Sequence, residues 1–198
     1  MNFQERKTQE TNIRAGIRIY GTGSYSIDTK IAFFDHMLEA FSKHSLIDLE
    51  LKCLGDIDVD YHHSVEDCGI VIGQLLRESI YPLNGVERFG NASVVMDEAC
   101  VECDIDLSNR AFLFYDLARK DLDEKILQGA ILDFNVELVE EWFRAVCMQS
   151  NISVHITLKR GRNLHHIIEA SFKAFAVALR RALMRNSQIS IPSTKGCL

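Results

Sequence analysis

The chain has 198 residues, 47% of them hydrophobic, and a formal net charge of −6. This length and apolar content are enough for a packed core in one domain or two small ones. The acidic balance argues against nucleic acid as the main partner, because phosphate backbones are bound by a basic excess. No apolar run is long enough to span a membrane and residues 1–10 contain no apolar signal segment, so we expect a cytoplasmic protein.

Six cysteines occur, and most lie inside apolar periodic segments. We interpret them as buried free thiols and not as a disulfide framework. Cys100 and Cys103 have the spacing of a metal or redox motif. Their surroundings, residues 91–106, predict a strand region, in which positions three apart point to opposite faces. We therefore interpret these two cysteines as packed thiols.

The first half of the chain alternates strand and helix patterns. A strand is predicted over 12–20 and an amphipathic helix over 33–44. Aliphatic residues then alternate with charged ones over 47–53, which is typical of a half-buried strand. A long helix is predicted over 62–80. Proline and glycine mark residues 81–90 as a linker.

The second half repeats this series. Strand regions are predicted over 91–106 and 110–117, then a helix over 136–149, a strand over 152–158 and a long helix over 165–184. The two series align with an offset of 103 to 105 residues. Two halves of this kind bury their apolar faces best as sheets backed by helices.

We therefore predict an α+β fold built by internal duplication. Residues 1–86 form the first half and residues 87–198 the second. Each half is expected to be a mixed β-sheet backed by two helices.

A histidine pair followed by glutamate opens both long helices. The two copies are HHSVE at 62–66 and HHIIE at 165–169. Adjacent side chains on a helix diverge by about 100°, so neighbouring histidines cannot easily bind one ion. Imidazole and carboxylate together suit manganese, iron, zinc or nickel. Two ions, each taking one histidine from either copy, explain why the histidines are adjacent.

The helix before each core strand offers one more donor, since His36 aligns with Glu141. Spacing leaves open which histidine of each pair serves which ion. His155 lies on the polar face of its strand, and we interpret it as a surface residue or one that supports a metal ligand. One balanced assignment places His36, His63, Glu66 and His165 on one ion, and Glu141, His62, His166 and Glu169 on the other.

A second group of residues is basic. Arg88 and Arg110 flank the strands of the second half, Lys173 follows the second histidine pair, and residues 192–196 read PSTKG. Guanidinium, ammonium and hydroxyl groups are what a phosphate monoester needs. Each of these residues alone is more typical of a solvated charge, and His44 ends a helix, where a cation is favourable anyway.

Seven blocks of the sequence, in order from Arg6 to Gly196, resemble the imidazoleglycerol-phosphate dehydratase family. This resemblance implies dehydration of imidazole glycerol phosphate to imidazole acetol phosphate in histidine biosynthesis, by a form without a phosphatase segment. It also implies two manganese ions per site, a shell of 24 subunits with sites between subunits, and a ribosomal protein S5 domain 2-like fold in each half. The blocks are RKTQETNI (6–13), IDTKIAFFDHML (27–38), GDIDVDYHHSVED (55–67), MDEA (96–99), DLSNR (106–110), GRNLHHIIEASFKA (161–174) and PSTKG (192–196).

Carried over position by position, the resemblance assigns roles to individual residues. It implies catalytic carboxylates at Glu10, Glu66 and Glu169, and Glu10 is our candidate general acid and base. The metal ligands that match are His36, His62, His63, Glu66, His165, His166 and Glu169, with Glu141 as an eighth candidate at a position where many members have histidine. The implied substrate-binding residues are Glu10, His36, His44, His62, Glu66, Arg88, Arg110, His165, Lys173, Ser193, Thr194 and Lys195.

Besides Glu141, three other positions depart from the family pattern, because Lys30, Ala32 and Asn109 stand where glycine is usual. The change at Lys30 could alter the approach to His36, whereas asparagine often tolerates a positive φ.

Two other functions fit the same residues: a dinuclear-metal phosphoester hydrolase and a non-catalytic metal-binding assembly protein. The dehydratase requires Glu10 and the PSTKG segment to converge on the metal ions, and metal storage does not.

Overall fold

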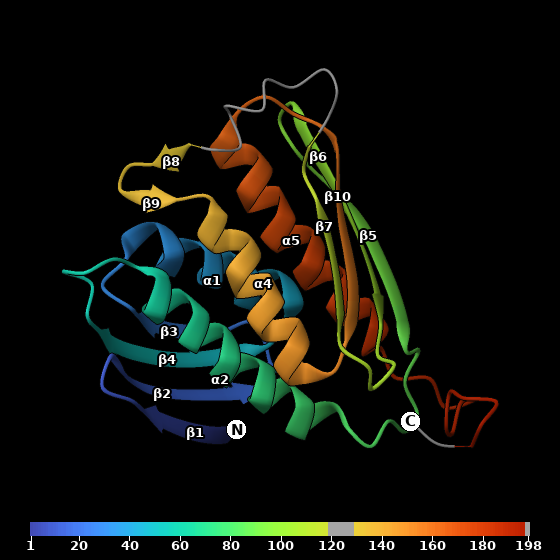
Figure 1. Cartoon of the computed structure of the whole chain (residues 1–198). Coiled ribbons are helices and arrows are strands. Elements are labelled where there is room, and N and C mark those ends of the chain that lie inside the picture. The colour runs from blue at the N-terminus through green and yellow to red at the C-terminus, as the bar shows by residue number, and fades with distance from the viewer. Residues whose placement is uncertain (119–128, 197–198) are drawn as a thin grey trace.

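The computed structural model describes residues 1–118 and 129–196. Two four-stranded sheets enclose the helices of these residues, which form a layer between them (Figure 1). The first half contributes β1 (Asn2–Lys7), β2 (Thr11–Arg18), β3 (Tyr25–Asp28), α1 (Ala32–Ser45), β4 (Asp48–Gly55) and α2 (His62–Ile80). The second half contributes β5 (Phe89–Met96), β6 (Ala99–Asp106), β7 (Phe112–Asp116), β8 (Ala130–Ile131), β9 (Phe134–Asn135), α4 (Glu137–Ser150), β10 (Ser153–Arg160) and α5 (Leu164–Ala182).

The two sheets have the same topology. Their strand orders are β1-β2-β4-β3 and β5-β6-β10-β7, and only the last pair of each sheet is parallel. Together with a helix pair on each sheet, this order confirms the predicted duplicated α+β fold. The described residues contain no helix that is both long and apolar enough to cross a membrane.

The strand registers locate the one large difference between the halves. Leu49 of β4 pairs with Ile17 and Tyr25, and Val154 of β10 pairs with Ile105 and Leu113. The offset is therefore 88 residues for the two neighbouring strands (105 − 17, 113 − 25) and 105 for the central one (154 − 49). The extra 17 residues lie between β7 and α4, where the connection 117–136 replaces the three residues 29–31.

Aromatic side chains fix three of the helices to one another. Trp142 of α4 is fully buried and stacks on Phe172 of α5, with ring centroids 4.7 Å apart. Phe41 of α1 lies 5.9 Å from the Trp142 ring and 5.7 Å from Phe175. Each such pair adds about 0.5–1.5 kcal/mol beyond its area burial. This cluster holds α1 against α5, which positions the histidines described below.

Two glycines of α2 allow α4 to approach closely. A Cβ atom at Gly69 would lie 2.8 Å from the Cβ of Ala145, and one at Gly73 would lie 2.7 Å from the Cβ of Gln149. Larger side chains would push the helices apart. The two contacts advance together along both chains, so α2 and α4 run in the same direction.

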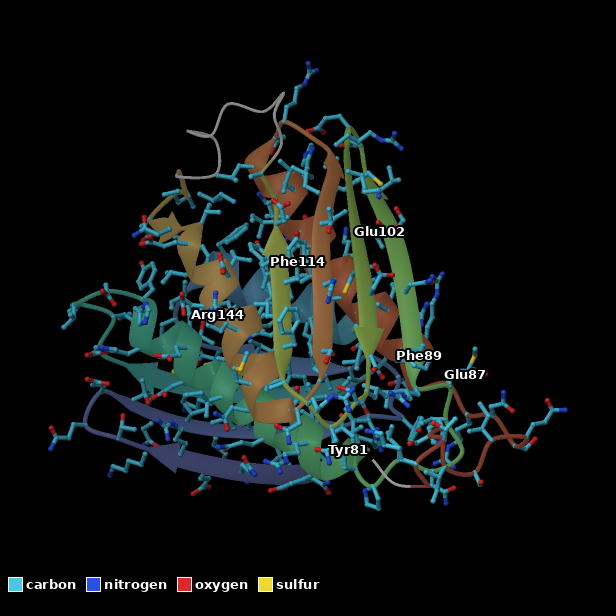
Figure 2. All side chains as sticks on the ribbon, turned by 45° about the vertical axis from the view of Figure 1, so that its right-hand side comes forward. Tyr81, Glu87, Phe89, Glu102, Phe114 and Arg144 are labelled. Carbon is cyan, nitrogen blue, oxygen red and sulfur yellow. The ribbon has the colours of Figure 1, made fainter. Side chains whose placement is uncertain are left out.

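The structure refines the predicted strands. Residues 91–106 form a hairpin, β5 and β6, because Asp97 adopts a φ of 48° and reverses the chain. The edge strands β1 and β3 were not predicted. Cys100 and Cys103 are buried free thiols, as expected, and so are the other cysteines of the described residues, whereas Cys197 lies outside them. Phe114 and Glu102 mark the outer face of the second sheet (Figure 2).

Candidate metal and phosphate sites

The start of α5 carries a group of metal-binding side chains. The Oε2 atom of Glu169 lies 3.2 Å from Nε2 of His165 and 3.6 Å from Nε2 of His36. Among the described residues this is the one group of three such side chains whose donor atoms all lie within 4.8 Å of one another. Lys173 binds the other carboxylate oxygen of Glu169, at 2.7 Å, and leaves Oε2 turned toward the two histidines.

Helix geometry assembles this group. Positions four apart lie on one face of a helix, so His165, Glu169 and Lys173 form a row along α5. His36 reaches the row because α1 packs on α5. Lys30 takes a left-handed φ of 67°, a conformation that favours glycine, and His36 still contacts Glu169.

The row also contains charges of opposite sign. Burial opposes the charge of Glu169, but its hydrogen bond with Lys173 lowers the pKa of this carboxyl below its ordinary value. Glu169 is therefore anionic and ready to bind a cation. His44 lies two turns after His36 on α1, and burial together with nearby Lys173 lowers its pKa, which favours the neutral imidazole.

The first half holds a corresponding pair at the start of α2. Nε2 of His62 lies 3.6 Å from Oε2 of Glu66. The counterpart of His36 is Glu141 on α4, which is half-buried. Because α2 and α4 run in the same direction and touch at Gly69 and Ala145, Glu141 faces the helix turn of Glu66. Within the described residues, the Glu141 carboxylate makes no hydrogen bond or ion pair.

The second histidine of each pair points elsewhere. The ring planes of His62 and His63 are 87° apart, and those of His165 and His166 are 82° apart. The intrachain group thus joins His36 and His165, as in the balanced assignment from spacing, but with Glu169 where that assignment had His63 and Glu66.

Carboxylates surround the second histidine of each pair, His63 and His166. Asp56 lies 3.0 Å from Nδ1 of His63, and this hydrogen bond raises the pKa of the imidazole. Glu10 lies 3.7 Å from Nε2 of the same ring. In the second half, Glu98 lies 2.7 Å from Nδ1 of His166, and this hydrogen bond lowers the pKa of Glu98 to about 2.

Most of the predicted phosphate-binding residues line a cavity of about 440 Å³ at the C-terminal segment, whereas Lys173 instead binds Glu169 in the histidine group. Asn109 takes a φ of 53° there, as expected for a residue in place of glycine. The guanidinium of Arg88 donates to Asp106 and to the carbonyl of Pro192, so it holds the C-terminal segment in place. The lining residues include no carboxylate; they are Arg88, Ser108, Asn109, Arg110, Ser193, Thr194 and Lys195.

The C-terminal segment that lines this cavity follows the far end of α5 (Figure 1), whereas His165 and Glu169 lie at the start of that helix. The backbone N–H of Arg88 donates to the carbonyl of Ala182, the last residue of the helix. Glu169 precedes Ala182 by 13 residues, which corresponds to about 20 Å along the helix axis. A single chain therefore does not bring the two groups together.

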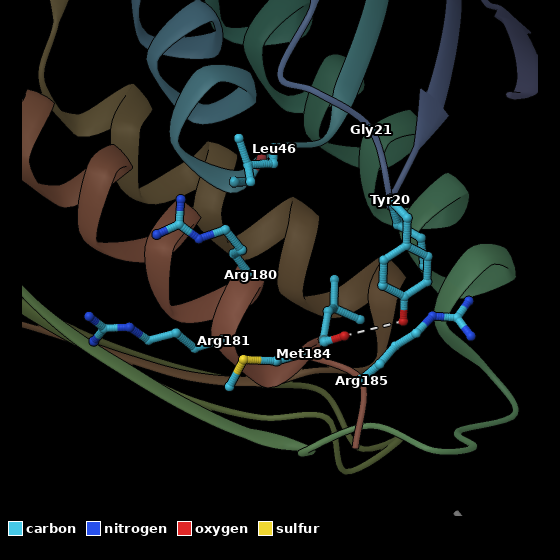
Figure 3. A pocket seen from close by; sticks show the side chains of 10 residues that line it. Tyr20, Gly21, Leu46, Arg180, Arg181, Met184 and Arg185 are labelled. Atoms are coloured by element: carbon cyan, nitrogen blue, oxygen red, sulfur yellow. Dashed lines mark hydrogen bonds between the residues drawn. The ribbon is translucent and has the colours of Figure 1, made fainter. Parts of the chain in front are cut away.

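A larger cavity, of about 550 Å³, lies beside the C-terminal end of α5 (Figure 3). Tyr20, Leu46 and Met184 form part of its wall, and the Tyr20 hydroxyl donates to the carbonyl of Leu183. Its lining contains arginines but neither histidine nor carboxylate. It therefore offers no ligand for a metal ion.

Known proteins are similar to this chain in sequence and in fold. A model of the imidazoleglycerol-phosphate dehydratase family matches residues 29–179. The imidazoleglycerol-phosphate dehydratase of Wolinella succinogenes is 58% identical over 193 residues, which cover 98% of this chain and 97% of that protein. The protein of the same name from Helicobacter hepaticus is 61% identical, with 98% and 94% covered.

This chain belongs to the imidazoleglycerol-phosphate dehydratase family. Two crystal structures of the family are similar to it throughout. The Staphylococcus aureus enzyme has a TM-score of 0.79 and 36% identity, with 94% of this chain and 100% of that chain covered. The Pyrococcus furiosus enzyme, in complex with (S)-C348, has a TM-score of 0.80 and 35% identity, with 98% and 100% covered.

Sequence reasoning gave no role to Asp56 or Glu98, although both lie in blocks that resemble the dehydratase family. One signal could have found Glu98. At the offset of 88 that relates the strands, Glu98 corresponds to Glu10 (98 − 10). The histidines beside them, His63 and His166, correspond at the offset of 103 that relates the long helices (166 − 63).

Proposed function

We propose that this chain is a metal-dependent dehydratase that converts imidazole glycerol phosphate to imidazole acetol phosphate, a carbon–oxygen lyase step of histidine biosynthesis. The observation that carries the proposal is the group of His36, His165 and Glu169 in a chain of this family. The reaction removes the hydroxyl from the carbon attached to the imidazole ring and a proton from the next carbon. The resulting enol becomes the ketone of the product.

The donor set fits the manganese ions that we propose as cofactor, two per active site. Two imidazoles and one anionic carboxylate converge in the second half, and mixed nitrogen and oxygen ligands suit Mn²⁺. In the first half the corresponding residues His62, Glu66 and Glu141 would take part in holding the second ion. When bound, the ions supply positive charge that stabilises the substrate's ring as it loses a proton.

Glu10 is the proposed general acid and base. Its carboxylate is half exposed and lies 3.7 Å from His63, so it stands at the edge of the metal-binding residues without being buried among them. A carboxylate in that place can take the carbon-bound proton and return a proton to the departing hydroxyl, which leaves as water. Glu66 and Glu169 orient the histidines beside them and hold negative charge for the cations.

The cavity at Arg110 and Lys195 is proposed to bind the substrate's phosphate. It presents cations and hydroxyls, which form charge-assisted hydrogen bonds to phosphate oxygens. An imidazole ring, three carbons and one phosphate are shorter than the roughly 20 Å that separate this cavity from the histidine group along α5. We therefore propose that active sites form between subunits, in the 24-subunit shell that the family resemblance implies.

The direct test is an assay of the purified protein with imidazole glycerol phosphate, with and without Mn²⁺. We expect imidazole acetol phosphate only when metal is present. Release of inorganic phosphate would support a hydrolase instead, and metal binding without any turnover would support a storage or assembly protein.

A second measurement tests the assembly. If metal ions join ligands of neighbouring subunits, chelation of the ions should change the sedimentation coefficient of the particle. An unchanged particle mass after complete metal removal would count against metals as the connection between subunits.

A further inference from the structure

The duplication places one glutamate beside a helix-start histidine in each half. Glu10 ends the turn between β1 and β2, and Glu98 ends the turn between β5 and β6. Both precede strands that correspond at the offset of 88 residues. Glu10 lies near His63, and Glu98 lies near His166. The two glutamates are therefore counterparts, yet they contact opposite nitrogens of the corresponding imidazoles.

Both carboxylate oxygens of Glu98 accept hydrogen bonds from neighbouring groups. Its Oε2 atom lies 2.7 Å from Nδ1 of His166, while Oε1 accepts hydrogen bonds from the backbone N–H groups of Arg162 and Asn163. A carboxylate can only accept, so Nδ1 of His166 carries the proton. The lone pair of this imidazole is then on Nε2, the nitrogen left for a metal ion, and the exposed carboxylate of Asp97 lies 3.8 Å from it.

Glu10 has no such task, because Asp56 performs it. Asp56 oxygens lie 3.0 and 3.2 Å from Nδ1 of His63, which fixes the same tautomer with the lone pair on Nε2. Glu10 lies on that Nε2 side, 3.7 Å away. Its carboxylate therefore lies on the side of the imidazole that the proposed metal ion would bind, whereas the carboxylate of Glu98 lies on the opposite side of its own histidine.

The strand register explains why the halves differ. Leu54 pairs with Asn12 and Arg160 pairs with Cys100, so these positions correspond once the bulge after Leu158 is included. Two residues further on, Asp56 corresponds to Arg162. A guanidinium has no acceptor and cannot bind the N–H of an imidazole. The second half consequently uses Glu98 to orient its histidine.

We propose that Asp56 and Glu98 are positioning residues for His63 and His166, and that Asp56 thereby frees Glu10, the counterpart of Glu98, for proton transfer. The duplication thus yields one acid–base glutamate and one orienting glutamate. The part that concerns proton transfer rests on the proposed function. The orienting role does not, because it concerns metal binding by imidazoles whose other nitrogen is held by a carboxylate.

Metal affinity tests the orienting role. In Mn²⁺ calorimetry on the full chain, Asp56→Ala and Glu98→Ala should each weaken one binding event by about 10–100-fold. Asp56→Asn and Glu98→Gln keep an oxygen that accepts from Nδ1–H and should recover most of the affinity. Asp58→Ala is the matched control, because this exposed carboxylate of the same loop makes no contact with a histidine within the described residues. Wild-type affinity in both alanine variants would overturn the role.

Solid-state ¹⁵N NMR of the metal-free, histidine-labelled protein provides a readout that does not depend on metal loading. Each alanine variant should shift one imidazole away from the tautomer protonated at Nδ1, and each amide variant should not. An unchanged tautomer in both alanine variants would also overturn the orienting role.

Kinetics at saturating Mn²⁺ test the division between the two glutamates. Glu10→Gln should lower kcat by about 10²–10⁴-fold with unchanged Mn²⁺ affinity, as expected for a general acid–base residue. Glu98→Gln should keep most of the wild-type kcat. Equal losses of kcat in both variants would overturn the division. If wild-type protein fails to turn over imidazole glycerol phosphate, the proposed function is wrong, and the Mn²⁺ and NMR comparisons still decide the orienting role.

Discussion

The two halves of the chain share their sheets and helix pairs but differ where the helices meet. At the histidine pair of the second half, His36 of α1 lies beside the start of α5. In the first half, α4 carries the counterpart Glu141, but among the described residues no group of three donor atoms within 4.8 Å of one another forms there. Here α4 and α2 approach closely because α2 carries Gly69 and Gly73. Both halves keep the same backbone and the same histidine pair at the start of the long helix, whereas the residues that approach this pair from other elements differ, as His36 and Glu141 do. A duplicated fold therefore need not contain two chemically equal sites.

The connection between β7 and α4 adds a second difference. Its hairpin has no counterpart in the first half, and it touches the surroundings of both histidine pairs. Phe134 packs 5.3 Å from Phe33, which itself lies 5.3 Å from the ring of His165. Asp133 accepts a hydrogen bond from Tyr61, the residue before His62. The hairpin thus links the starts of α1, α2 and α5.

The largest expected effect comes from removing the second histidine of either pair, His63 or His166. His63→Ala and His166→Ala should each lose about one of two ions per chain. Activity should fall by more than roughly 10–100-fold, the loss typical when a residue that hydrogen-bonds a metal ligand is removed. Elemental analysis of dialysed protein measures the ions. His155→Ala is the control, because this histidine lies between Phe112 and Phe114 on the outer face of the second sheet. Two ions retained in both variants would contradict the assignment.

The phosphate cavity should give the next largest effect. Lys195→Ala and Arg110→Ala should each raise KM, or the Kd of a substrate analogue, by about 10–150-fold, which corresponds to roughly 1.5–3 kcal/mol per lost charge-assisted contact. Arg185→Ala is a matched control in the larger cavity, where the guanidinium lies over the Tyr20 ring. A raised KM for this control, with wild-type values for the other two, would place phosphate in the larger cavity.

Asp48 and its counterpart Ser153 test how the halves hold their loops. Asp48 is buried and accepts hydrogen bonds from Arg18 and from the backbone N–H groups of Thr22 and Ser24. Ser153 donates a hydrogen bond to the carbonyl of Arg110, and its hydroxyl also shares one with the hydroxyl of Ser108. In thermal or urea unfolding at pH 7, Asp48→Asn should cost about 1–3 kcal/mol, whereas Ser153→Ala should cost about 0.5–1.5 kcal/mol.

The effect of Asp48 should depend on pH. Burial opposes its charge, but the hydrogen bonds from Thr22, Ser24 and Arg18 hold its pKa well below the ordinary value. The stabilisation is therefore complete above the ordinary aspartate pKa of about 4 and is lost as the pH falls below it. The difference between wild type and Asp48→Asn should stay constant from pH 7 to about pH 5 and shrink as the pH falls below about 4. A difference that does not shrink there would contradict this role.

Local patterns predicted much of the fold. The predicted helix over 62–80 agrees with α2, because its apolar period is continuous and a proline follows it. β1 was missed because its residues are polar and mostly exposed, so that it is a strand only through its pairing with β2. An edge strand of this kind depends on its partner and leaves no hydrophobic alternation in the sequence.

The site shows the same limit. Repetition of the histidine pairs revealed candidate ligands, because their spacing is local to one helix. The grouping of His36 with Glu169 depends on how α1 packs against α5. The spacing of residues along the sequence does not reveal this packing. Asp56 and Glu98 approach their histidines from loops, and a loop carboxylate carries no periodic signal. Distances between elements, rather than residue types, were the missing information.

The smallest expected effect concerns Glu141, where the two halves differ most directly. It is half-buried on α4 and faces the turn of α2 that carries Glu66, since the contact of Gly69 with Ala145 lies one turn further along both helices. Its counterpart His36 lies 3.6 Å from Glu169. The same relation between the helices places Glu141 beside the turn of α2 that carries His62 and Glu66, although the donor atoms of these three residues do not all lie within 4.8 Å of one another.

Manganese accepts carboxylate oxygen as well as imidazole nitrogen, so Glu141 can substitute for histidine. Glu141→Gln should weaken one of two Mn²⁺ binding events and lower turnover, because a neutral amide is a poorer ligand. Glu141→His should keep both ions, since it recreates in the first-half site the donor that His36 supplies to the second. Glu140→Gln is the control, because this neighbouring carboxylate pairs with Arg144 on the same helix. Calorimetric titration of Glu141→Ala that matches wild type for both ions would remove Glu141 from the ligands and leave the other seven residues.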